Sequence, residues 1–129
     1  MKKLLLIFTL LFTTLVFSSP SYADWTKIGT NVDGTTFYVD FDRIKKHDGY
    51  VYYWELSDYL KPFLTGDLSS KTYIQGDCKL FGMKVLSFAF HKQPMGRGSG
   101  NVRKHPIQEW RYPPPNSSGE TILKSVCTK

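Results

Sequence analysis

The sequence predicts an α+β fold in which one C-terminal helix covers a face of a β-sheet. Two observations predict the sheet: aromatic residues make up 16% of the chain, and several runs alternate apolar with polar side chains, as a half-buried strand does. A third predicts the helix, because Ser117 and Glu120 precede apolar residues that are spaced for one helical face. Removing the leader described next would leave 106 of the 129 residues (129 less 23), which suits one domain over residues 24–129.

The first 23 residues are typical of a secretory signal peptide. Lys2 and Lys3 precede an apolar run over residues 4–17, and Ser21-Tyr22-Ala23 has the small-x-small pattern of a cleavage site. We expect the mature chain to begin at Asp24. The alternative is a retained membrane anchor. The apolar run argues against it, because the run has 14 residues and roughly 20 are needed to span a bilayer. The cleavage site has no cysteine to accept a lipid, which predicts export to the periplasm or cell surface without a lipid anchor or membrane span.

Short elements are expected at the start of the mature chain, because β-favouring runs alternate with turn residues. They are a strand at 24–29, a turn at 31–34, a strand at 35–40 with Phe37 and Val39 on one face, and a helical turn over 41–46 that ends at 47–49. The segment 50–59 has the strongest strand pattern. Its two faces carry Tyr52, Trp54 and Leu56, which we expect to form the core face, and Val51, Tyr53 and Glu55.

Two further strand segments follow. A strand over 69–78 places Thr72, Ile74, Gly76 and Cys78 on one side. Residues 79–90 form a fifth long segment, or two joined by a bend, and Gly82 within it indicates a bulge or a close approach of another segment.

Residues 93–116 are rich in glycine and proline, so regular structure should be sparse there, apart from a short strand at 108–111. The helix then begins after Ser117, whose hydroxyl can cap the free amides while Glu120 completes a capping box. The apolar face of this helix consists of Ile122, Leu123, Val126 and Cys127.

Cys78 and Cys127 are the two cysteines of the chain. An oxidising compartment normally joins such a pair. Because Cys78 shares a side with Ile74 and Cys127 lies on the apolar helix face, the disulfide would tie the helix to the sheet. A redox pair or metal ligands are the alternatives, but residues 49 positions apart lack the C-x-x-C spacing of those sites.

Charge is distributed unevenly along the mature chain. Residues 24–78 contain nine Asp and Glu against six Lys and Arg, whereas residues 79–129 contain two against nine. The second half should therefore present a basic surface that attracts anionic partners, more weakly as salt is added; the alternative is that these charges only provide solubility. Met95 and Trp110 could add apolar anchors. The candidate partner-binding residues, in or beside the glycine-rich segment, are Lys84, Lys92, Arg97, Arg103, Lys104 and Arg111.

Catalytic and metal-binding patterns are weak in this sequence. The three histidines, His47, His91 and His105, lack the spacing that brings two ligands to one metal. Asp40 and Asp42 share one face if extended, but a solvated turn explains them equally well. The nucleophile-elbow and phosphate-loop motifs are missing. We expect a non-enzymatic protein without cofactor or metal, and export argues against nucleic acid as its partner.

Several short motifs occur in an order that resembles the surface-adhesin protein E family of bacterial exported proteins. They are W-x-K-I-G (25–29), F-Y-V-D-F-D-R-I (37–44), Y-Y-W (52–54), S-S-K-T-Y-I-Q-G-D-C (69–78), M-G-R-G (95–98), Trp110 and V-C (126–127). The resemblance covers essentially the whole mature chain. It implies an antiparallel sheet of about six strands, a C-terminal helix tied to it through Cys78 and Cys127, and non-enzymatic binding of host or matrix proteins.

Two functional hypotheses follow. In the first, the chain is an exported adhesin-like domain that binds proteins or anionic polymers. In the second, it is a periplasmic envelope-assembly or housekeeping component that contacts other envelope proteins through its sheet edge.

Overall fold

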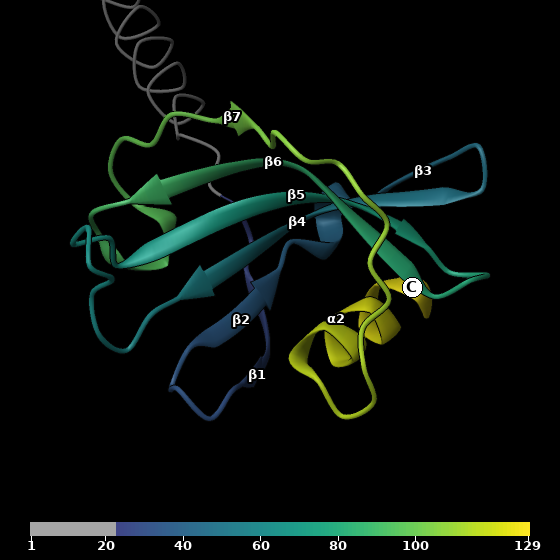
Figure 1. Cartoon of the computed structure of the whole chain (residues 1–129), viewed down its shortest axis with the longest axis horizontal. Coiled ribbons are helices and arrows are strands. Elements are labelled where there is room, and N and C mark those ends of the chain that lie inside the picture. Colours follow the sequence, from purple (N-terminus) through teal and green to yellow (C-terminus); the bar gives the residue numbers. More distant parts are fainter. Residues whose placement is uncertain (1–22) are drawn as a thin grey trace, which may run out of the picture.

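Seven strands form one antiparallel sheet, and a C-terminal helix packs on one of its faces (Figure 1). The computed structural model describes residues 23–129, so the expected signal peptide, residues 1–23, lies outside the described residues except for Ala23. In this part of the chain no helix is long and apolar enough to cross a membrane. The elements are β1 (Thr26–Thr30), β2 (Thr36–Val39), the 3₁₀ turn η1 (Phe41–Arg43), β3 (Lys45–His47), β4 (Tyr50–Asp58), β5 (Ser69–Asp77), β6 (Gly82–His91), the 3₁₀ turn η2 (Pro94–Gly96), β7 (Arg103–Lys104) and α2 (Ser118–Cys127).

The strand order is β1-β2-β4-β5-β6-β7, and β3 also pairs with β4. β2 and β3 share one edge of β4: β2 pairs with its second half and β3 with its first half. The expected helical turn over 41–46 is therefore correct for η1 and wrong for the residues that form β3. Asp48 and Gly49, both at positive φ, form the tight hairpin turn that returns β3 onto β4. The antiparallel sheet is confirmed, with one strand more than the six expected.

β6 is one continuous strand that is held on both sides. A Cβ atom on Gly82 would lie 2.9 Å from the Tyr112 ring, so this glycine marks a close approach. The bulge lies further along, because Tyr73 pairs with Ser87 and Ile74 with Val85, which leaves Leu86 without a partner in β5.

The expected strand at 108–111 is wrong. Only Arg111 of this segment pairs, through an isolated bridge to Met83. The strand that pairs with the outer edge of β6 is β7 instead. Pro106 and the prolines at 113–115 flank the segment, and proline has no N–H to contribute to a ladder.

The core lies between the sheet and α2. Val51, Tyr53 and Ile74 face the helix, where they meet Ile122 and Val126. The expectation that Tyr52, Trp54 and Leu56 form the core face is wrong, because Val51 and Tyr53 face the helix. Of the expected set only Leu56 is fully buried, on the opposite face near Gly96 of η2. Aromatic residues occupy both faces of β4 and both faces are covered in places, so alternation alone could not choose the helix-facing side.

The helix begins as its capping pattern predicts. The Glu120 amide donates to Ser117 Oγ at 3.2 Å, and Glu120 Oε1 accepts from the Asn116 amide at 3.3 Å. The reciprocal bond thus reaches one residue before the cap. Ile122, Leu123 and Val126 are buried, which confirms the predicted apolar face.

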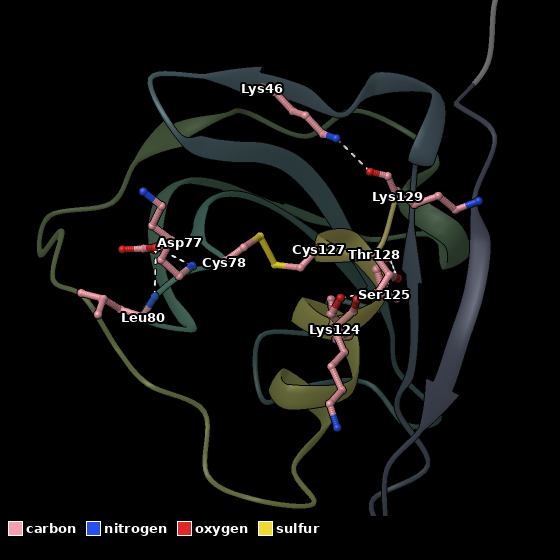
Figure 2. Close-up of a disulfide and its surroundings, with 11 residues drawn as sticks. Lys46, Asp77, Cys78, Leu80, Lys124, Ser125, Cys127, Thr128 and Lys129 are labelled. Carbon is pink, nitrogen blue, oxygen red and sulfur yellow. Dashed lines mark hydrogen bonds between the residues drawn. A yellow bond between two sulfur atoms is a disulfide. The ribbon is translucent and has the colours of Figure 1, made fainter.

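The disulfide between Cys78 and Cys127 ties the end of α2 to the turn after β5, as predicted (Figure 2). The two Cα atoms are 5.7 Å apart. Asp77 Oδ1 accepts from the amides of Lys79 and Leu80 and so fixes this turn. The Lys46 ammonium donates to the Lys129 carbonyl at 2.9 Å, which gives the end of the chain a second attachment to the sheet.

A carboxyl group in the middle of β4 makes stability depend on pH. Burial raises the pKa of Glu55 from 4.5 to about 7, although the side chain keeps partial exposure. Between pH 4.5 and about 7 the native state therefore holds a proton on Glu55 that the unfolded chain releases, so the contribution of Glu55 to the free energy of unfolding should fall as pH rises through this range.

The variant Glu55→Gln should lose this pH dependence and be more stable than the native chain above pH 7. Urea denaturation on either side of this pH range measures the difference. Glu109→Gln, at an exposed loop position, is the matched control. If Glu55→Gln keeps the native slope, Glu55 is not the responsible group.

Candidate functional site

The six basic residues predicted to bind partners lie in separate places and do not form one patch. Lys92 and Arg103 line a hollow beside β6 and β7, whereas Arg97 lines another hollow near η2. Lys84 lies at the opposite end of β6, and Arg111 pairs with its neighbour Met83. Lys104 lies on β7 and pairs with Ser87 of β6. The structure thus brings together Lys92 with Arg103, and Lys84 with Arg111.

The first of these places, which we call the edge hollow, has a volume of about 380 Å³. Strand alternation places Phe88, Phe90 and Lys92 on one side of the chain at the end of β6. β7 then places Arg103 directly opposite Phe88. The edge hollow is lined by Asp67, Phe88, Phe90, Lys92, Ser99, Gly100, Asn101 and Arg103.

The lining of the edge hollow includes two basic side chains, Lys92 and Arg103, and the rings of Phe88 and Phe90. The Lys92 ammonium lies 3.1 Å from the Asp67 carboxylate. The Thr65 hydroxyl, and after it Lys92, holds the pKa of Asp67 below its usual range, so this carboxylate stays ionised. Arg103 forms no ion pair with any described residue. Since the Phe88 and Phe90 rings pack 5.6 Å apart and Phe90 is 45% exposed, the hollow offers one uncompensated cation beside an apolar surface.

Trp110 holds a loop against the sheet. The Lys84 ammonium lies 4.6 Å from the centroid of its ring, and the Tyr50 ring packs 5.5 Å away. Arg111 exchanges two backbone hydrogen bonds with Met83, each of 2.8 Å. These contacts engage Trp110 and Lys84 within the protein, so they serve to fasten the segment that leads to α2.

Sequence reasoning did not bring together a second polar cluster, on the sheet face opposite α2. Asp40 and His91 lie in separate segments of the sequence, and nothing around Lys71 marks it as a site residue. All three line a pocket of about 240 Å³, with Trp25 and Trp54. They come from separate strands and connections, and no local motif links them. Within residues 23–129 no three His, Cys, Asp or Glu side chains gather as metal ligands would.

The sheet, the helix and the disulfide that joins them are the architecture that the sequence resemblance implied. The chain belongs to the surface-adhesin protein E family, whose model matches residues 25–128. No curated protein sequence matches the chain.

Solved structures of Haemophilus influenzae protein E have a similar fold. One crystal form has a TM-score of 0.64 at 14% sequence identity, and the match covers 84% of this chain and 91% of that one. A structure from a non-typeable strain has a TM-score of 0.61 at 13% identity, with coverage of 85% and 79%. At this identity the likeness establishes the fold alone.

Proposed function

We propose that this chain is an exported, non-enzymatic binding domain of adhesin type, which holds anionic polymers or acidic segments of proteins in its edge hollow. Membership of the surface-adhesin protein E family supports an adhesive role. The observation that carries the proposal is the uncompensated Arg103 beside the exposed ring of Phe90, at the rim of the sheet.

The charges of the edge hollow favour a partner of this kind. Arg103 can bind a sulfate or carboxylate through two parallel hydrogen bonds. Lys104 follows it on β7, where it points to the other face of the strand, and adds positive charge to the same edge of the sheet. Attraction between exposed charges is screened within about 8–10 Å at physiological salt, so binding should weaken as salt is added.

Neutralising the rim should weaken retention on a heparin column. The variant Arg103→Gln/Lys104→Gln should elute at clearly lower salt, because it removes two exposed cations of the edge strand, one of which, Arg103, lines the hollow. Arg97→Gln should have a smaller effect than Arg103→Gln, since Arg97 lines a different hollow. The control Lys27→Gln/Lys124→Gln loses the same charge at exposed positions elsewhere. Equal shifts for both double variants would reduce retention to net charge and reject the edge hollow as the site.

A second candidate function rests on β1. This strand pairs with β2 on one side only, and among the described residues its other edge has no strand partner. Such an edge can accept a strand of another protein, as a periplasmic envelope component would require. Protease treatment of intact cells separates the two functions: cleavage supports the surface adhesin, and protection until the outer membrane is opened supports the periplasmic component.

A further inference from the structure

The pocket on the sheet face opposite α2, which we call the central pocket, is made of polar groups around two indoles. Register places Trp54 and Lys71 on the face away from the helix, because the alternating Val51 and Tyr53 face the helix. The Asp40 amide donates to the Trp54 carbonyl, which holds the end of β2 against β4. The polar and aromatic lining comprises Trp25, Asp40, Arg43, Trp54, Lys71 and His91.

Two of these side chains are buried with polar atoms that have no partner. Asp40 is 1% exposed; its Oδ2 lies 3.3 Å from Arg43 Nε, while Oδ1 makes no hydrogen bond with the described residues. His91 is 4% exposed and neither ring nitrogen has a well-aligned hydrogen bond, but the backbone of Arg97 and Gly98 lies beside the ring. Buried polar atoms nearly always have a partner, and a hydroxyl group of a ligand in the pocket could supply one to Asp40 Oδ1.

The charges around the pocket favour an anion. Asp40 is the one carboxylate of its lining and already pairs with Arg43. Lys71 forms no ion pair with any described residue, and burial together with Arg43 lowers the pKa of Lys71. Burial, and then Lys71, lowers the pKa of His91 despite the opposing effects of the Gly98 and Arg97 backbone and the Asp67 carboxylate. An anion beside Lys71 would offset the repulsion of Lys71 with Arg43 and His91.

We propose that the central pocket binds one acidic sugar unit. Its hydroxyl groups would donate to Asp40 Oδ1, its carboxylate would accept from the Lys71 ammonium, and its C–H face would pack on the indoles. The volume of 240 Å³ is below the roughly 300–1,000 Å³ of sites for drug-sized ligands, which limits the occupant to about one ring.

An adjoining hollow gives an attached chain a direction in which to continue. This hollow has a volume of about 670 Å³, shares Trp25 and Lys71 with the central pocket, and is lined further by Met95 and Arg97. A second acidic unit would meet the exposed Arg97 there. Short oligo-uronates should therefore bind more tightly than a single uronate.

Tryptophan fluorescence tests this inference, because two of the three tryptophans line the pocket. The mature chain, purified after export, is titrated with D-glucuronate, with tri-galacturonate and with neutral D-glucose. We expect saturable changes for the two acids, tighter binding of the trimer, and none for glucose. Lys71→Met keeps the stem but loses the charge and should weaken glucuronate binding about 10-fold or more. Lys45→Met, at an exposed position on β3, should bind like the native chain.

Three results would overturn the inference: glucose binding as well as glucuronate, neither acid changing the emission, or native affinity in Lys71→Met. Trp25→Leu, which lies before β1, provides a second variant if Lys71→Met does not fold, and native affinity in this variant is equally contrary. Arg103→Gln, in the edge hollow, should keep native glucuronate affinity. The central pocket and the edge hollow can therefore fail independently.

Discussion

Replacing both cysteines by serine should lower the free energy of unfolding by about 4 kcal/mol, the chain-entropy value for a loop of about 50 residues. The bond joins Cys78 to Cys127, 49 positions apart. A small domain is stable by roughly 5–15 kcal/mol, so the loss is a large part of the total. Urea denaturation of Cys78→Ser/Cys127→Ser against the native chain measures it.

The loss should appear in α2 before it appears in the sheet. The helix has 10 residues, which is shorter than the roughly 12–15 that are marginally helical alone in water. It therefore depends on its packing and on the bond at its last residue. β4, β5 and β6 keep their own hydrogen-bond ladders.

Hydrogen exchange locates the loss. Amides of α2 should lose protection in the cysteine variant, while amides of β5 keep most of theirs. Lys46→Met is the control, because it removes the other attachment of the chain end to the sheet, a single exposed hydrogen bond, and should change little. Equal loss of protection in α2 and β5 would mean that helix and sheet unfold as one unit.

What could be predicted from the sequence depended on local chemistry. The capping box needs only Ser117 and Glu120, three positions apart, and the structure forms the bond between them. The disulfide needed only two cysteines on apolar faces of neighbouring elements. β3 could not be predicted in this way, because Lys45–His47 is charged and exposed and becomes a strand only where β2 leaves half of the β4 edge free.

The central pocket could not be predicted from the sequence either, because it also depends on how distant segments meet in the sheet. His91 ends β6 and Asp40 follows β2, and each is unremarkable in its own segment. Their unpartnered atoms acquire meaning only when the sheet brings them to one face with Lys71 and the indoles. The edge hollow was partly predictable, since basic residues near the glycine-rich loop were evident. However, the division of those residues among separate places depends on β7, whose two residues gave no strand signal.

Leu123→Ala should be the most damaging single substitution on the helix, at about 2–5 kcal/mol. Leu123 is fully buried, and Gly76 of β5 leaves the space that its side chain enters: a Cβ atom at Gly76 would lie 3.1 Å from Leu123 Cδ1. Alanine at position 123 leaves a cavity against backbone that cannot collapse easily. Leu80→Ala, at a side chain that is 68% exposed, is the control and should cost less than about 0.5 kcal/mol.

The pairing of Leu123 with Gly76 can be tested by a double-mutant cycle. Gly76→Ala alone should destabilise the native chain, because its methyl group would lie 2.9 Å from Val51 Cγ2 as well as close to Leu123. In the Leu123→Ala background the methyl group enters the cavity, so the same substitution should cost less. Costs that simply add would show that the two residues do not share this space. A coupling between them would establish that a glycine in β5 sets how closely the helix approaches the sheet.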